Sequence, residues 1–208
     1  MHLVRKLAAL ATATSVLTLS ACTDLKRFAY EGFGRDDWQQ PARVVETLAI
    51  APGSRVADIG AGGGYFTFRL ADAVGPDGTV YAIDVDSGML DYISKRAKKE
   101  GRQNVEPVLA TADDPGLPEG GVDLIFTSNT YHHLPDRPAY FARLAQGVRD
   151  GGRIAIVEYA PKGWFTKLFG HSTPEETIRT EMEQAGYRLV ADHDFLDRQS
   201  FLVFTPSR

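Results

Sequence analysis

One short segment, from Val56 to Tyr65, constrains this chain more than any other part of it. Its sequence is VADIGAGGGY: an apolar stretch that carries Asp58 is followed by five residues, four of which are glycine. Glycine adopts positive φ and lets another molecule approach the backbone, because it has no Cβ. The amphipathic segment that follows, Phe66–Val74, would place unpaired helix N–H groups beside the loop. A strand, a glycine loop and a helix in this order predict a site for a nucleotide-type cofactor.

The spacing of the glycines argues against two common phosphate-binding motifs. Counted from Gly60 and Gly62, the third glycine of the dinucleotide fingerprint G-x-G-x-x-G would fall on Tyr65, whose side chain is large. No lysine follows the loop, so the phosphate cradle of mononucleotide sites is missing as well. The pattern is D-x-G-x-G-x-G, from Asp58 to Gly64. A cofactor without phosphates fits it better, with a carboxylate available for an ammonium group.

Strand and helix patterns alternate along most of the chain. Apolar segments bounded by turn residues predict strands at Val56–Ile59, Thr79–Asp84, Val105–Leu109, Val122–Thr127, Arg153–Val157, Arg188–Asp192 and Phe201–Thr205. Helices are predicted at Pro41–Leu48, at Phe66–Val74, from a cap at Ser87 to near Glu100, near Ala139–Val148, and from a cap at Thr173, with Pro174 in the first turn, to near Gly186. This alternation predicts a mostly parallel sheet with helices on both faces.

Polar side chains lie at or just after the carboxyl ends of several of the predicted strands. They are Asp58, Asp84, Asp113, Asn129 and Glu158. In open α/β sheets, ligands bind outside the carboxyl ends of the strands, near the point where the strand order reverses. We therefore expect the site at this edge of the sheet.

Five segments together resemble the class I S-adenosylmethionine-dependent methyltransferases. They are VADIGAGGGYFTFRLA, VYAIDVD, ATADDPGLP, DLIFTSNTYHHLPD and GGRIAIVEY, in the order that the family has them. The resemblance extends from about Trp38 to Phe204 and is strongest to small-molecule enzymes related to the quinone-biosynthesis methyltransferases. It implies an α/β fold with a Rossmann-like seven-stranded mostly parallel sheet sandwiched by helices. It also implies methyl transfer from S-adenosyl-L-methionine to a small-molecule acceptor.

The resemblance implies roles for individual residues. Asp58 would hold the methionine ammonium group through water, and Asp84 would bind both ribose hydroxyls. Other residues would line the cofactor or flank its adenine: Gly60, Gly62, Gly64, Tyr65, Val85, Met89, Asp113 and Asn129. Asp113 would accept a hydrogen bond from the adenine amino group, although Asp114 could share this role or take it instead. The alternative for each aspartate is a helix cap or a loop carboxylate.

The run Tyr131-His132-His133 is the second conspicuous cluster. His132 or His133 could act as the catalytic residue that takes a proton from the acceptor, because histidine titrates near neutral pH. Alternatively, the histidines hydrogen-bond to the backbone and orient the loop. Methyl transfer from a sulfonium needs mainly alignment and exclusion of water, so a base is not essential. A metal site made of the histidines and Glu158 is not expected, because their spacing does not match known ligand patterns.

The acceptor pocket is expected to combine aromatic residues with the segment Tyr131–His133. The candidates are Phe28, Tyr30, Phe33, Trp38, the segment Trp164–Phe169 and His171. Ordinary packing is an equally good interpretation of each of these residues alone. Arsenite methylation, the reaction of a related group, is not expected, because Cys22 is the only cysteine.

The first residues indicate export. Arg5 and Lys6 precede an apolar stretch, Leu7–Leu19, which leads to Ser20-Ala21-Cys22 and resembles the lipobox of bacterial lipoproteins. The alternative is an apolar N-terminal helix that ends in cysteine by chance. The resulting division is a lipoprotein signal peptide at 1–21, a linker or cap segment at 22–40 and the methyltransferase domain at 41–208. Lipidation of Cys22 would attach the protein to the periplasmic side of a bacterial membrane.

This location conflicts with the cofactor, which is made in the cytoplasm. The enzyme could be exported and supplied there, or an inefficient signal could leave it in the cytoplasm. The second candidate function is an exported adenosyl- or small-molecule-binding module without methyl transfer. The chain has a net charge of -4 and no basic stripe, so nucleic acid is not an expected partner. The sequence does not indicate an oligomeric state.

Overall fold

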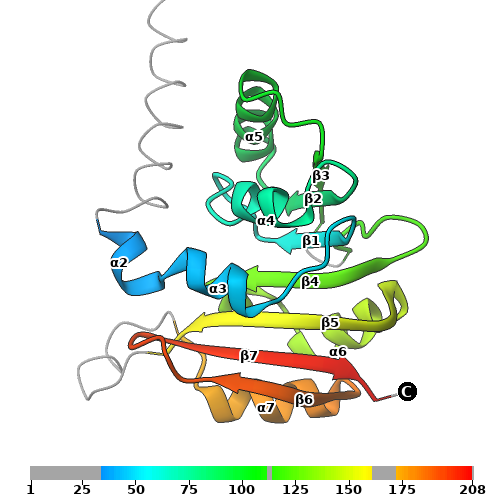
Figure 1. Ribbon diagram of the computed structural model, residues 1–208. Coiled ribbons are helices and arrows are strands. Elements are labelled where there is room, and N and C mark those ends of the chain that lie inside the picture. Colours follow the sequence, from blue (N-terminus) through cyan, green and yellow to red (C-terminus); the bar gives the residue numbers. More distant parts are fainter. Residues whose placement is uncertain (1–33, 112–113, 161–171, 208) are drawn as a thin grey trace, which may run out of the picture. The chain divides into compact units, whose positions relative to one another are not determined.

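A seven-stranded sheet organises the part of the chain that the computed structural model describes, residues 34–111, 114–160 and 172–207 (Figure 1). The strands are β1 (Arg55–Ile59), β2 (Thr79–Asp84), β3 (Val105–Leu109), β4 (Val122–Ser128), β5 (Val148–Tyr159), β6 (Tyr187–His193) and β7 (Gln199–Pro206). Their order is β3-β2-β1-β4-β5-β7-β6. The pairs from β3 to β5 are parallel, and β7 is antiparallel to both its neighbours. The predicted Rossmann-like, mostly parallel sheet is confirmed.

Helices cover both faces of this sheet, as predicted (Figure 1). They are α2 (Arg35–Gln39), α3 (Pro41–Thr47), α4 (Thr67–Val74), α5 (Ser87–Lys99), α6 (Arg137–Leu144) and α7 (Glu175–Gln184). Successive strand residues point to opposite faces, so Phe126 joins the core beneath α3, α4 and α5, whereas Ile125 joins the core beneath α6 and α7. Because both faces are covered, the inner strands β1 and β4 are buried at most of their positions.

The chain reverses its direction of travel across the sheet between β1 and β4. From β1 the chain moves through α4 to β2 and β3, and then returns to β4 on the other side of β1. The carboxyl ends of β1 and β4 therefore meet at the switch point, where ligands of such sheets bind.

The starts of two helices differ from the prediction. Asp86, not Ser87, caps α5: its side chain accepts from the backbone N–H groups of Gly88 and Met89, and Ser87 is the first helical residue. In α7, Pro174 is the cap residue, Thr173 lies outside the helix, and no side chain caps it. Asp and Ser are both good caps, so the sequence alone does not determine which of the two neighbours caps α5.

The prediction of a helix near Ala139–Val148 is wrong at its C-terminal end. The α-helix stops at Leu144, a 3₁₀ turn (η2) follows at Ala145–Gly147, and β5 already begins at Val148. The register between β4 and β5 is irregular there: Val122 pairs with Val148, but Leu124 pairs with Arg153. Glycines in this stretch allow the bulge, since Gly151 has φ of +78°.

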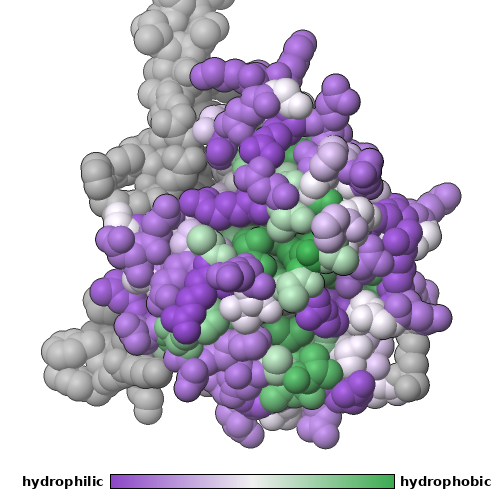
Figure 2. All heavy atoms as spheres, viewed as in Figure 1, coloured by the Kyte–Doolittle hydropathy of each residue, from purple (hydrophilic) through white to green (hydrophobic). Residues whose placement is uncertain are grey.

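The compact unit of the chain begins at Gly34 and includes α2, which the sequence did not predict. In the face seen in Figure 2, hydrophilic side chains dominate the rim and apolar ones gather toward the middle. Every helix in the described part of the chain is too short or too polar to cross a membrane.

Candidate functional site

The glycine loop between β1 and α4 is tied to the neighbouring strand. The N–H groups of Gly60 and Ala61 both donate to the carbonyl oxygen of Ile83 in β2, over 2.8 and 3.1 Å. Gly60, Gly62 and Gly64 all have positive φ, of +75°, +51° and +82°. A Cβ on Gly60 would lie 2.1 Å from Oγ1 of Thr130. A larger residue therefore cannot occupy that position without displacing Thr130, which directly precedes the histidine turn (Tyr131–His133). Glycine is therefore required both by conformation and by space.

Asp84 ends β2 beside this loop, and its carboxylate is fixed in place. Oδ2 accepts from the N–H of Gly62 over 2.8 Å, and Oδ1 accepts from the N–H of Asp86 over 2.9 Å. Each carboxylate oxygen can accept a further hydrogen bond, so the pair can still receive two hydroxyl groups. The side chain thus meets the requirement of a diol-binding group.

Apolar side chains lie exposed next to Asp84. Val85 follows it in the chain and Leu109 is its partner in β3, and they are 66% and 62% exposed. They offer an apolar surface to a flat ring at this edge of the sheet. Met89, the other candidate for this role, is 2% exposed and packs in the interior.

Asp58 lies inside β1 and is buried. Oδ2 accepts from the hydroxyl of Thr67 over 2.6 Å. Burial raises the pKa of Asp58 to about 7, which outweighs the lowering effects of the Thr67 hydrogen bond and of the positive charge of Arg35. A cationic ligand group at Asp58 would favour the ionised form.

Arg35 is a residue of this site that the sequence reasoning missed. It comes from α2, and its guanidinium lies 3.7 Å from the ring centroid of Tyr65 and close enough to Asp58 to influence its pKa. Tyr65 is also bound to α2 through its hydroxyl, which donates to Asp36 over 2.5 Å. Gly34 before α2 and the acidic residues in its first turn are helix-start signals, but five residues are too few for a periodic pattern.

Asn129 follows β4 in a left-handed conformation with φ of +53°. Its N–H donates to the carbonyl oxygen of Val157, and its side-chain oxygen accepts from Nε2 of Gln199 over 2.9 Å. On the same strand end, the hydroxyl of Ser128 accepts from Nε2 of Gln39 in α2. Strands β4, β5 and β7 and helix α2 are thus joined at the carboxyl edge.

The two histidines have different surroundings. They lie in a 3₁₀ turn, η1 (Tyr131–His133), with ring centroids 4.0 Å apart. Nδ1 of His132 lies 2.6 Å from Oε1 of Glu158, whereas the side chain of His133 is exposed. Burial raises the pKa of Glu158 to about 7, against the lowering effect of nearby backbone amides and Arg137. The sequence predicted Glu158 at this edge but not its contact with His132.

A partly buried ion pair fixes the histidine turn to α7. Arg137 donates to both carboxylate oxygens of Glu181 over 2.6 and 2.7 Å, and the Tyr131 hydroxyl donates to the same carboxylate over 2.7 Å. Arg137 lowers the pKa of Glu181, so this network is present at neutral pH and is lost as the pH falls through that lowered value.

We expect Glu181→Ala to lower the free energy of unfolding by about 2–4 kcal/mol, because it leaves the Tyr131 hydroxyl and Arg137 without their acceptor. Urea denaturation followed by circular dichroism measures the change. Glu183→Ala, an exposed position on the same helix, serves as the matched control. A loss no larger than that of the control would contradict the role of the network.

Several predicted site residues lie outside the described residues: Asp113, Cys22, Phe28, Tyr30, Phe33, Trp164–Phe169 and His171. Asp114 is described; it is exposed and its carboxylate accepts from the N–H of Gly116 within its own turn. Trp38 of α2 packs edge-on against Tyr159, the last residue of β5, with ring centroids 6.3 Å apart. Among the residues that the structure describes, no three His, Cys, Asp or Glu side chains form a group that could hold a metal ion.

Comparisons with known proteins agree with this geometry. Residues 56–152 match the family model described as a methyltransferase domain. The chain is 37% identical to aklanonic acid methyltransferase DauC of Streptomyces sp. (strain C5) over 114 residues, which are 55% of this chain and 52% of that protein. It is 32% identical to nocamycin O-methyltransferase of Saccharothrix syringae over 133 residues, which are 64% of this chain and 48% of that protein. The chain thus spans about half the length of these curated relatives.

A solved structure covers more of the chain. The SAM-dependent methyltransferase from Aquifex aeolicus superposes with a TM-score of 0.76 at 25% sequence identity, over 89% of this chain and 96% of that one. The glycine loop, Asp58, Asp84, Asn129 and the histidine turn all lie within residues 56–152. Arg35 and Glu158 lie outside that range.

Proposed function

We propose that this chain, whose residues 56–152 match a methyltransferase domain model, is a class I S-adenosylmethionine-dependent methyltransferase that transfers a methyl group from S-adenosylmethionine to a small-molecule acceptor. The observation that carries the proposal is Asp84, whose carboxylate is held by two backbone N–H groups at the switch-point edge of the sheet. The residues present fit this cofactor. Asp84 suits its ribose diol, and exposed Val85 and Leu109 suit its adenine.

The amino-acid end of the cofactor carries one positive and one negative charge. Asp58 in β1 and Arg35 in α2, which is close enough to lower the pKa of Asp58, supply one negative and one positive charge to match them. Asp58 would receive the ammonium group and Arg35 the carboxylate, as planar guanidinium groups do well. Asn129, at the end of β4, would line the same end.

Bound S-adenosylmethionine supplies an activated methyl group: the acceptor oxygen bonds to the methyl carbon while the carbon–sulfur bond breaks, its electron pair remaining on sulfur. The chain's residues align the acceptor and exclude water, with Trp38 and Tyr159 as one wall. The proton of the acceptor passes to a ring nitrogen of His132, with His133 as the alternative. The name of the relative nocamycin O-methyltransferase supports oxygen as the methylated atom.

Calorimetric titration of residues 23–208 tests the binding step. We expect S-adenosylmethionine and S-adenosylhomocysteine to bind and NAD not to bind. Transfer of the labelled methyl group from S-adenosylmethionine to a panel of hydroxylated small molecules then tests turnover. Failure of both adenosyl ligands to bind would refute the proposal, and binding without any transfer would favour a binding module.

Affinity for S-adenosylhomocysteine should depend on the ionisation of Asp58. Its pKa of about 7 means that the carboxyl is mostly protonated at pH 5.5 and must ionise to receive an ammonium group. We expect the affinity to rise about 10- to 30-fold between pH 5.5 and 7.5, measured by calorimetry. Asp58→Asn should bind more weakly and lose this dependence, whereas Glu158→Gln should keep it. An equal pH dependence in Asp58→Asn would exclude Asp58 as the ammonium partner.

We also propose that residues 1–21 are an export signal and that Cys22 is lipidated and holds the protein at a bacterial membrane on its periplasmic side. Support comes from the basic start, the short apolar core and the lipobox-like Leu19-Ser20-Ala21-Cys22. Metabolic labelling with a radioactive fatty acid tests the proposal by comparing the natural chain with Cys22→Ala. Equal membrane recovery of both proteins, with no label in either, would refute lipidation.

A further inference from the structure

Glu158 is a buried carboxyl group with a single side-chain partner. It is the penultimate residue of β5 and has no exposed surface. Oε1 lies 2.6 Å from Nδ1 of His132, and Oε2 makes no hydrogen bond to any residue that the structure describes. A buried acidic group with one oxygen unsatisfied is costly, and an apolar residue of similar size would pack there at less cost. Packing of the sheet alone therefore does not account for this residue.

His132, the partner of Glu158, lies close to the glycine loop at which we expect the methyl donor. The histidine turn begins directly after Thr130, whose side chain lies against Gly60 of the glycine loop. The proposed methyl donor and His132 thus share the same edge of the sheet. An imidazole that donates its Nδ1 proton to a carboxylate is held in one tautomer, which leaves Nε2 as the basic nitrogen. The same arrangement orients catalytic histidines in other enzyme classes.

We propose that Glu158 is a positioning residue: it accepts the Nδ1 proton of His132, fixes the ring, and so makes Nε2 the atom that receives the proton of the acceptor. The inference rests on the proposed function. As the acceptor's O–H bond breaks, its proton moves to Nε2 and its electron pair forms the bond to the methyl carbon. The imidazolium that results lies against the Glu158 carboxylate, which stabilises it at the moment when the charge develops.

The test reads the tautomer of His132 directly, by nitrogen-15 NMR of the full-length chain labelled in its histidines. His132→Gln identifies the signals, and His133→Gln serves as the matched control. At pH 8, where the Glu158 carboxyl group is ionised, we expect the natural chain to have the proton of His132 on Nδ1. Glu158→Gln should keep this tautomer, because the amide oxygen can accept in the same place, whereas Glu158→Leu should shift the population toward the Nε2-protonated form. Calorimetry with S-adenosylhomocysteine should give affinities within about twofold of one another for the natural chain, Glu158→Gln and Glu158→Leu, since Glu158 acts only through His132.

A proton on Nε2 of His132 in the natural chain would overturn the inference, and this result needs no variant to fold. An unchanged tautomer in folded Glu158→Leu would overturn it as well. A tenfold loss of S-adenosylhomocysteine binding in that variant would instead place Glu158 in the cofactor site. Failure of the natural chain to bind S-adenosylhomocysteine would count against the proposed function, whatever the tautomer of His132.

Discussion

Replacing Asp84 with alanine should raise the dissociation constants of S-adenosylmethionine and S-adenosylhomocysteine by about 100-fold or more. Two hydrogen bonds from hydroxyl groups to a carboxylate contribute about 1.5–3 kcal/mol each, and each 1.4 kcal/mol is a tenfold change in affinity. The variant also leaves the N–H groups of Gly62 and Asp86 without their acceptors, which loosens the loop. Isothermal titration calorimetry of both ligands measures the effect.

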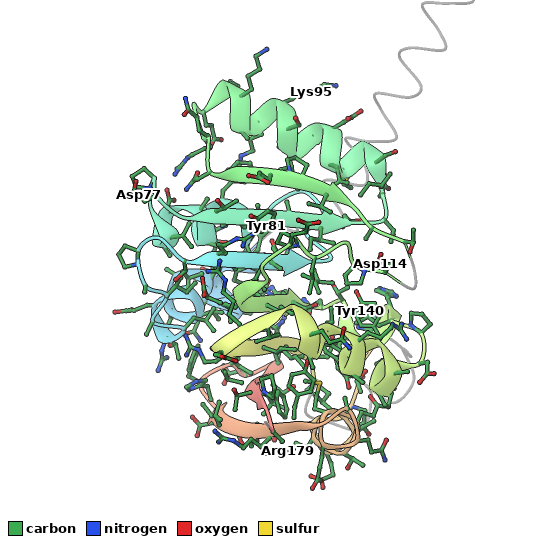
Figure 3. The ribbon with its side chains drawn as sticks, turned by 90° about the vertical axis from the view of Figure 1, so that its right-hand side faces the viewer. Asp77, Tyr81, Lys95, Asp114, Tyr140 and Arg179 are labelled. Carbon is green, nitrogen blue, oxygen red and sulfur yellow. The ribbon has the colours of Figure 1, made fainter. Side chains whose placement is uncertain are left out.

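Asp77→Ala is the matched control for this experiment. Asp77 lies in the turn before β2, at the opposite end of the strands from Asp114 and the site (Figure 3). We expect its affinities to stay within twofold of those of the natural chain. If Asp84→Ala also binds within threefold, the ribose is held elsewhere and the central observation behind the proposed function fails.

Gly60→Ala should lower the free energy of unfolding by about 2–5 kcal/mol, as the sum of backbone strain and steric overlap. The backbone has φ of +75°, and the new Cβ would lie 2.1 Å from Oγ1 and 2.5 Å from Cγ2 of Thr130. The histidine turn that follows Thr130 must therefore move. Urea denaturation measures the stability, and calorimetry with S-adenosylhomocysteine should show a loss of binding in protein that still folds.

A variant at a second glycine measures the cost of backbone strain without steric overlap. Gly53 has φ of +82°, but no atom lies within 4 Å of the position of its Cβ. Gly53→Ala should therefore show the cost of strain alone, about 1 kcal/mol. Thr130→Ala should restore part of the stability lost in Gly60→Ala. If both glycine variants lose equal stability, the close packing of the loop against Thr130 is not a constraint.

The inner strands β1, β2 and β4 were predictable because each is a buried, largely apolar run between turn residues. β1, β2 and β3 differ from the predicted segments by at most one residue at either end. The beginning of β5 was not predictable, because its pairing with β4 depends on a bulge whose glycines resemble an ordinary loop. The choice of Asp86 over Ser87 as the cap likewise depends on local geometry that the residue types leave open.

The candidate site was predictable where one residue follows a strand, and not where two distant segments meet. The glycine loop and Asp84 could be identified because each directly ends a predicted strand. The contact between His132 and Glu158 joins residues 26 positions apart and depends on the register of β4 against β5. Arg35 reaches the site from a helix too short to have a sequence period. The ligand roles given to Asp58, Asp84 and Asn129 stay predictions until binding is measured.

Asp58 and Glu158 have an effect on the folded state that is separate from ligand recognition. Burial raises the pKa of each to about 7, above the values of 3.8 and 4.5 that are usual for these groups. Between about pH 4 and 7 the unfolded chain releases both protons while the folded chain keeps them, so the free energy of unfolding falls as the pH rises through this window. At neutral pH the protein thus gives up stability to keep two acidic groups in its interior. Apolar replacements of similar size should therefore stabilise the protein at neutral pH, at the expense of the ligand and histidine contacts proposed for the two carboxyl groups.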